Sequence, residues 1–209
     1  MRSVLREVLA RRLEDAPPPR VVDHDAFLAG FSAAARRFGD ALLCLDPEES
    51  DRLTRSGVDW PIASKLCEMW RVVALVELPD GADLEPLVRE CYRTGDTGER
   101  RAVLRALPLL REPERFVALA VDACRTSVLP IFEAACCENP YPARHFPELH
   151  WNQMILKAVF LGVPLNRVIG LPGRLGPEIE RMANDYASER RAAGRDVPED
   201  LKLLVRSGR

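Results

Sequence analysis

The sequence lacks the features that would point directly to a membrane or to nucleic acid. No run approaches the roughly 18–20 consecutive apolar residues of a membrane-spanning helix, and the basic N-terminus is not followed by the apolar core of a secretion signal. The 30 basic and 32 acidic residues nearly cancel, so no overall charge attracts nucleic acid or an anionic membrane. We therefore expect a cytoplasmic protein that neither inserts into a membrane nor binds nucleic acid.

Cysteine spacings typical of metal or redox sites are also missing. None of the six cysteines forms a C-x-x-C pair, and only Cys136 and Cys137 are neighbours. Because the cysteines lie in patterns rich in alanine and leucine, we interpret them as small buried apolar residues. A vicinal disulfide or redox switch at Cys136–Cys137 is the alternative. We expect no cofactor and no metal.

Strand-like alternation of apolar and polar residues is absent, whereas helix signals are frequent. A short helix is predicted over residues 3–13, followed by a stiff connector at Pro17–Pro19. Acidic residues that can cap a helix, prolines and glycines mark the bounds of the others. These predicted helices are 24–38, 47–56, 59–77, 83–94, 97–107, 113–127, 128–138, 147–161, 177–193 and a short helix after Pro198.

The predicted helices recur in pairs. The pairs start near residues 60, 97, 129 and 164, a spacing in the range of helix-pair repeats. We therefore predict an all-α fold, a HEAT-like array of helical hairpins (an α-solenoid), in a single domain over residues 1–209. Within it, residues 1–57 would form N-terminal helices, 58–162 repeat-like helix pairs and 163–209 a C-terminal helical cap.

Polar side chains that could bind a ligand concentrate between residues 139 and 157. On the predicted helix 147–161, two apolar sides alternate with two polar stripes, as on a helix packed between two neighbours. Polar stripes on such a helix must be hydrogen-bonded or must face a groove. One hypothesis is a pocket for a polar ligand at the N-terminal end of this helix and in the loop before it. Its residues would be Tyr141, His145, Glu148, Asn152, Gln153 and Lys157.

Three other interpretations of this stretch stay open. The polar pairs can simply connect helices and satisfy loop carbonyls. His145, oriented by Glu148, can act as a general acid or base, because imidazole titrates near neutral pH. His145, Glu148 and His150 are metal-ligand types, but their spacing is not that of a helical i, i+4 pair.

Two sequence blocks resemble the EboA family. They are HFPELHWNQMILKAVFLGVPLNRVIGL, residues 145–171, and NDYASERRAAGRDVPEDL, residues 184–201. The resemblance implies an accessory protein encoded among secondary-metabolite genes. Such clusters also encode proteins similar to a prenyltransferase, a metal-dependent hydrolase, a sugar isomerase and a dehydroquinate synthase. The family is associated with handling or exporting a small metabolite, and the resemblance implies no settled chemical activity.

The sequence thus supports three hypotheses for function. The first is a non-catalytic helical-repeat protein that binds a small metabolite or a cluster-encoded partner protein in its groove. The second is a small metabolite-processing enzyme, with His145 as acid or base and Glu148 as its orienting group. The third is a purely structural scaffold. The sequence does not define the oligomeric state.

Overall fold

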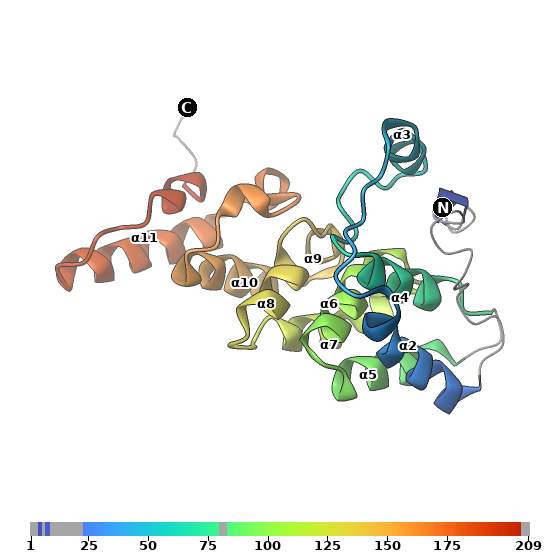
Figure 1. Cartoon of the computed structure of the whole chain (residues 1–209). Coiled ribbons are helices and arrows are strands. Elements are labelled where there is room, and N and C mark those ends of the chain that lie inside the picture. Colours follow the sequence, from blue (N-terminus) through green and yellow to red (C-terminus); the bar gives the residue numbers. More distant parts are fainter. Residues whose placement is uncertain (1–3, 6, 9–22, 80–82, 206–209) are drawn as a thin grey trace. The chain divides into compact units, whose positions relative to one another are not determined.

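The computed structural model of the chain is built from helices (Figure 1). It describes residues 4–5, 7–8, 23–79 and 83–205. Within these ranges there is no strand, only an isolated antiparallel bridge between Leu42 and Lys65. The all-α prediction is therefore confirmed. The Pro17–Pro19 connector and most of the predicted helix 3–13 lie outside the described residues.

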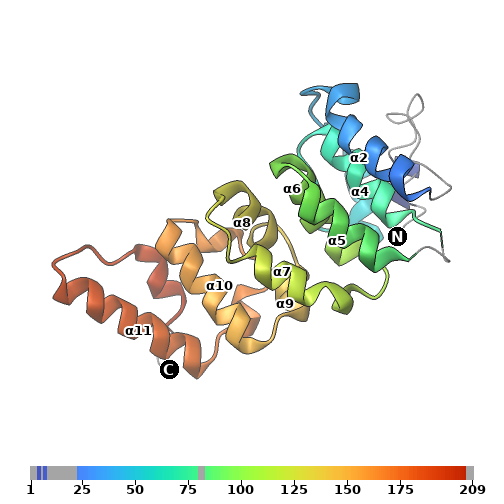
Figure 2. The same ribbon diagram turned by 90° about the horizontal axis from the view of Figure 1, so that it is seen from below.

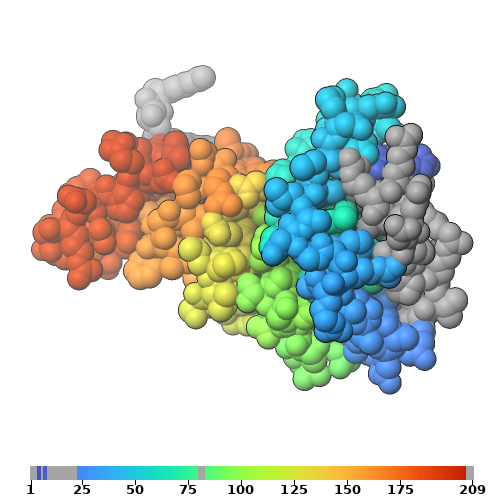
Figure 3. All heavy atoms as spheres, in the orientation of Figure 1, coloured from blue at the N-terminus to red at the C-terminus, as the bar shows by residue number. Residues whose placement is uncertain are grey.

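The chain divides into two compact units, Met1–Ala135 and Cys136–Arg209. In the first unit, α4 packs against both α2 and α6, and α5 packs against α6 (Figure 2). Helix α3 projects from this group (Figures 1 and 3), and only its Leu53 is buried. The helices of this unit are α2 (His24–Phe38), α3 (Pro47–Arg55), α4 (Leu66–Val76), α5 (Leu84–Thr94), α6 (Thr97–Ala106) and α7 (Val117–Ala123), with the short 3-10 helices η1 (Leu107–Leu109) and η2 (Pro113–Phe116).

The second unit begins at the end of α8 (Leu129–Cys136) and is organised around α10 (Glu148–Leu161), which packs against α11 (Pro177–Ala192). A five-residue helix, α9 (Tyr141–His145), precedes α10. Three 3-10 helices complete the unit: η3 (Leu165–Arg167), η4 (Leu171–Arg174) and η5 (Glu199–Leu203). The predicted boundaries at residues 57 and 162 stay a prediction.

Helix caps were predictable from sequence because their chemistry is local. Asp46 and Asp96 each accept a hydrogen bond from the backbone N–H three residues later, and Glu49 and Glu99 complete the two capping boxes. Gly194, with φ 64°, follows α11 in the left-handed conformation that favours glycine. These caps fix the starts of α3 and α6 and the end of α11 as predicted.

The predicted helix 59–77 begins seven residues later than expected. Residues 59–65 are not helical because they run beside an earlier segment: Leu43 N–H donates to the Ser64 carbonyl at 3.0 Å. Glu68 accepts from the Ser64 N–H at 3.1 Å. The helix therefore begins at Leu66, where its first N–H donates to the Ala41 carbonyl at 2.9 Å.

Helix α10 has two apolar sides, and only one of them is buried. Trp151 and Ile155 on its first apolar side are fully buried. On the second, Leu149 and Phe160 are 60% and 71% exposed. The expectation that both sides are covered by neighbouring helices is therefore wrong. Amphipathic spacing identifies apolar faces, but it does not say how many of them find a partner.

No helix among the described residues is both long and apolar enough to cross a membrane.

The cysteines confirm the packing interpretation at five of six positions. Cys67, Cys91, Cys124, Cys136 and Cys137 are buried, and only Cys44 is exposed. The Cys136 and Cys137 sulfurs lie 3.4 Å apart as free thiols. Burial raises the pKa of the Cys91 thiol to about 12.

We expect a disulfide-exchange reagent at pH 8 to modify one cysteine rapidly in the native protein and all six in denaturant. The thiolate is the reactive form, and a buried thiol is both shielded and kept protonated. Mass spectrometry after brief labelling would identify Cys44 as the modified residue. Rapid labelling of Cys91 in the native state would contradict the packing described here.

Candidate functional site

The predicted ligand-binding residues lie on α9 and α10, in the second unit. Tyr141 and His145 are the first and last residues of α9, not parts of a loop as expected. A proline at the second position of α9 and five residues of length gave too short a pattern to recognise. The two rings contact each other in a tilted arrangement, with centroids 4.7 Å apart and an interplanar angle of 34°. Tyr141 is almost fully buried, and His145 is partly buried.

The remaining predicted residues separate by exposure along α10. Asn152 is only 2% exposed, whereas Glu148 and Gln153 are exposed and Lys157 is half-buried. The Asn152 Nδ2 and the Trp151 Nε1 are buried, and neither has a hydrogen-bond partner in the described part of the chain. Such groups are costly unless a partner satisfies them. The pairing of His145 with Glu148 stays a prediction.

Arg174, from η4, connects the elements around α10. Its guanidinium lies 4.8 Å from the centroid of the Trp151 ring, in cation–π geometry. Its Nη1 also donates to the Pro142 and Ala143 carbonyls of α9, both at 3.1 Å. The arginine therefore holds α9, α10 and η4 together. Its contacts between these elements account for part of the polar character of this region.

No group of three or more histidine, cysteine, aspartate or glutamate side chains among the described residues could hold a metal ion. His145, Glu148 and His150 therefore do not form the metal site considered as an alternative. The His150 ring instead lies near Gln153, with Nδ1 3.4 Å from Oε1.

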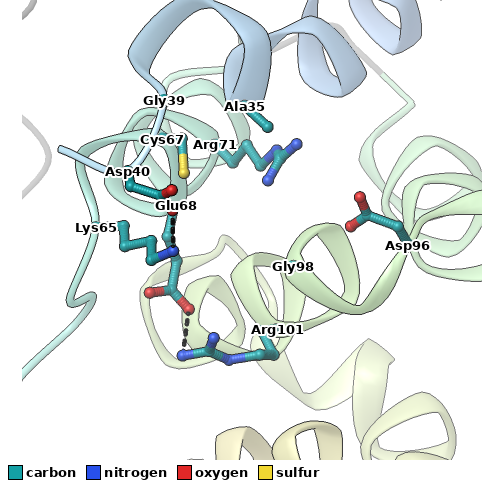
Figure 4. A pocket seen from close by; sticks show the side chains of 10 residues that line it. All are labelled: Ala35, Gly39, Asp40, Lys65, Cys67, Glu68, Arg71, Asp96, Gly98 and Arg101. Carbon is teal, nitrogen blue, oxygen red and sulfur yellow. Dashed lines mark hydrogen bonds and ion pairs between the residues drawn. The ribbon is translucent and has the colours of Figure 1, made fainter. Parts of the chain in front are cut away.

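A pocket that sequence reasoning missed lies in the first unit, between the end of α2, the start of α4 and the start of α6 (Figure 4). Its volume is about 280 Å³. We call it the polar pocket, because six charged residues line it. They are Asp40, Lys65, Glu68, Arg71, Asp96 and Arg101.

Arg71 forms the buried wall of the polar pocket, with its side chain 3% exposed. Its Nε donates to the Phe31 carbonyl at 2.8 Å, and its Nη2 lies 3.6 Å from Glu99 Oε1. The guanidinium also lies over the Phe31 ring, 5.5 Å from the centroid. A buried cation needs such compensation, because its transfer from water costs several kcal/mol.

Glu68 lies on the same helix, three residues before Arg71, and its side chain is 6% exposed. One carboxylate oxygen accepts from the Ser64 N–H. The other lies 3.3 Å from Arg101 Nη2, as drawn in Figure 4. Glu68 thus both binds the backbone just before α4 and connects α4 to α6 across the pocket.

The outer edge of the pocket is formed by an ion pair between Lys65 and Asp40. Hydrogen bonding to Asp40 raises the pKa of Lys65, and the same contact lowers the pKa of Asp40. Both groups are therefore charged at neutral pH. Because the pair is exposed to solvent, it is expected to contribute little to stability.

The third side of the pocket is the N-terminus of α6. Asp96 caps the helix through Oδ1, which accepts from the Glu99 N–H at 2.8 Å. Gly98 is the second residue of the helix. A Cβ atom at this glycine would lie 3.4 Å from Asp96 Oδ1 and 3.6 Å from Arg71 Nη1. The absence of a side chain at Gly98 therefore leaves open the space between these two charged groups.

Local sequence carries one signal for this pocket. Helix α4 reads LCEMWRVVALV and is apolar apart from Glu68 and Arg71. Two opposite charges three residues apart in an otherwise apolar helix indicate buried, compensated groups. Most of their partners come from distant segments, at Phe31 and Ser32 on one side and at Glu99 and Arg101 on the other, so the pocket itself depends on the fold.

Replacing Gly98 by alanine is expected to stabilise the protein by about 0.5–1 kcal/mol. Alanine favours the helix and restricts the unfolded chain, and the new methyl group meets only ordinary van der Waals contacts. Chemical denaturation measures the change. Gly30→Ala, inside α2 with Trp70 at 3.8 Å, is the matched control and should have the same sign. A loss of stability confined to Gly98→Ala would contradict the geometry of the pocket.

The comparison with protein families agrees with the resemblance in the two C-terminal blocks and extends it along the chain. Neither the comparison with curated proteins nor that with solved structures gives a match. The model of one protein family, described as "Metabolite traffic protein EboA", matches residues 19–206, which is most of the chain and includes both the polar pocket and α9–α10. The chain therefore belongs to the EboA family.

Proposed function

We propose that this EboA-family protein is a non-catalytic binding protein that holds a small polar metabolite in the polar pocket. The family description, metabolite traffic, supports a role in handling a metabolite. The pocket volume, about 280 Å³, lies just below the roughly 300–1,000 Å³ of drug-sized ligand sites and therefore suits only a small molecule.

The observation that carries this proposal is the position of Arg71. A guanidinium this deeply buried normally has all its donors satisfied by the protein. Among the described residues, however, nothing accepts a hydrogen bond from Nη1, the nitrogen nearest the open space beside Gly98. Nη1 is thus a donor on the lining of the pocket, where a polar ligand would accept its hydrogen bonds.

Three finer features belong to the same proposal. The metabolite would be the product of a secondary-metabolite gene cluster, as the family resemblance implies. A cluster-encoded partner protein would receive it or deliver it. The helices would form a HEAT-like array of hairpins, for which the packing of α2, α4 and α6 in the first unit is the supporting observation.

The proposal is tested by incubating the purified protein with a low-molecular-weight extract of cells that carry the gene, and identifying retained compounds by mass spectrometry. We expect the wild type to retain a compound that Gly98→Leu loses, since leucine would fill the space beside Arg71. Gly173→Leu is the control, because a side chain there meets open space. Equal retention by wild type and Gly98→Leu, or none by either, would refute the proposal.

The predicted residues of the second unit remain a second candidate site. The buried Asn152, whose Nδ2 has no hydrogen-bond partner within the described ranges, favours a polar ligand there. Its neighbours in sequence are Tyr141, His145, Glu148, Gln153 and Lys157. The enzyme hypothesis, with His145 as acid or base oriented by Glu148, applies to this same site. Retention unchanged in Asn152→Leu and His145→Ala, with stability intact, would remove this candidate.

A further inference from the structure

We infer that the ligand of the polar pocket is a small zwitterion, with its carboxylate on Arg71 and its ammonium group on Asp96. This inference rests on the proposed function and adds the chemical class of the ligand. It follows from which charged groups in the pocket are already paired, from how the unpaired groups face each other, and from the charge balance of the lining.

The pairing of the lining residues leaves one cationic group partly unsatisfied. Lys65 is paired with Asp40, and Arg101 with Glu68. Arg71 uses Nε and Nη2 toward Phe31, Ser32 and Glu99, and no described residue accepts from its Nη1, which leaves those N–H donors for a ligand. A carboxylate is the acceptor that matches a guanidinium best.

The pocket also retains one anionic group. Asp96 is an exposed residue that uses Oδ1 to cap α6, and among the described residues nothing donates to its Oδ2. Figure 4 shows its carboxylate directed toward the Arg71 guanidinium. Arg71 and Asp96 do not pair with each other among the described contacts. The Gly98 Cβ position, close to both, marks the space where one small molecule could reach the two groups.

The charges around the pocket favour a zwitterion over a ligand that carries a single charge. Three acidic and three basic side chains line the pocket, and Glu99, outside the lining, lies 3.6 Å from Arg71 Nη2, so the pocket has no excess of positive charge that would favour a simple anion. A simple anion on Arg71 would lie near the Asp96 carboxylate, and a simple cation on Asp96 would lie near the guanidinium. Like charges at short range are unfavourable, whereas a zwitterion would pair both groups.

Helix α6 supports the placement of the ligand carboxylate beside Arg71. The N-terminal turn of a helix carries partial positive charge and free N–H groups. Helix α6 has ten residues, and Gly98 lies in its first turn. Arg71 Nη1 lies 3.6 Å from the Cβ position of Gly98, so a carboxylate bound to Arg71 would lie near this turn.

Isothermal titration with matched probes tests the inference. The zwitterions are glycine, β-alanine and 4-aminobutyrate, which separate the two charges by increasing lengths. The single-charge probes are sodium acetate and methylammonium chloride at the same ionic strength. We expect at least one zwitterion to bind at least tenfold more tightly than either single-charge probe. No measurable zwitterion binding, or acetate binding as tight as any zwitterion, overturns the inference.

Two variants locate the binding. Gly98→Ala inserts a methyl group between Arg71 and Asp96 without harming the fold, and we expect at least tenfold weaker zwitterion binding. Gly30→Ala is the matched control and should bind like wild type. Asp96→Asn retains a good helix cap but loses the charge, so zwitterion binding should weaken while acetate binding should tighten. Unchanged zwitterion affinity in both Gly98→Ala and Asp96→Asn overturns the assignment.

The metabolite-binding function and the zwitterion assignment can fail separately. If the wild type retains an uncharged or singly charged compound that Gly98→Leu loses, the metabolite-binding function stands and the zwitterion assignment is wrong. If the extract yields nothing and no probe binds, both are wrong.

Discussion

Replacing Arg71 by methionine is expected to destabilise the protein by about 3–5 kcal/mol, the cost of breaking a buried ion pair from one side. The Glu99 carboxylate, with its side chain 8% exposed, would lose its cation. The Phe31 carbonyl would also lose the donor that lies 2.8 Å away. Methionine has a similar length and fills part of the space left by the arginine. Most of the destabilisation should therefore come from the uncompensated charge of Glu99, and little from lost packing volume.

Chemical denaturation followed by circular dichroism measures this effect. The control is Arg181→Met on α11, where the arginine pairs with Glu178 and Asp185 at 2.7 Å but is 60% exposed. That change should cost at most about 1 kcal/mol, because solvent screens exposed ion pairs. A cost for Arg71→Met no larger than for Arg181→Met would contradict the buried pair.

A second substitution separates charge from packing. In the Arg71→Met background, Glu99→Gln removes the unpaired buried charge, while its amide oxygen can still accept from the Asp96 N–H in the capping box. We expect the double variant to recover part of the lost stability. A double variant less stable than Arg71→Met alone would show that packing, not charge, explains the loss.

Sequence reasoning performed best where structure depends on neighbouring residues. Asp46, Asp96 and Gly194 mark helix ends because a cap bonds within its own turn. It failed at residues 59–65, where pairing with residues 41–43 replaces the expected helix. It also failed at Phe160, where an apolar side chain remains exposed because no neighbouring element covers it.

The same distinction explains the two candidate sites. The stretch around His145 was identified because its polar residues lie close together in sequence. The polar pocket was missed because its wall comes from three segments, near residues 35–40, 65–71 and 96–101. Only the packing of α4 against α2 and α6 brings Arg71 near Gly98 and Asp96. Long-range contacts of this kind leave no spacing pattern in the sequence.

Gly95→Ala is expected to destabilise the protein by about 1–3 kcal/mol, the usual cost of overpacking, although Gly98→Ala three residues later should stabilise it. Gly95 has φ −68°, which alanine adopts easily, so the cost comes from contacts. A Cβ atom there would lie 2.4 Å from the Cys91 carbonyl oxygen and 2.8 Å from Glu99 Cβ. The Cys91 backbone and the buried capping residue Glu99 cannot move away from the new methyl group without a cost in folding free energy.

The backbone shift forced by Gly95→Ala should also reach the polar pocket. Asp96 follows directly, and its N–H and side chain make both bonds of the capping box with Glu99. Displacing that box moves Asp96 relative to Arg71, so we expect weaker ligand binding together with the loss of stability. Denaturation and titration on Gly95→Ala and Gly98→Ala measure both quantities. If the two variants change stability in the same direction, the packing described for the start of α6 is incorrect.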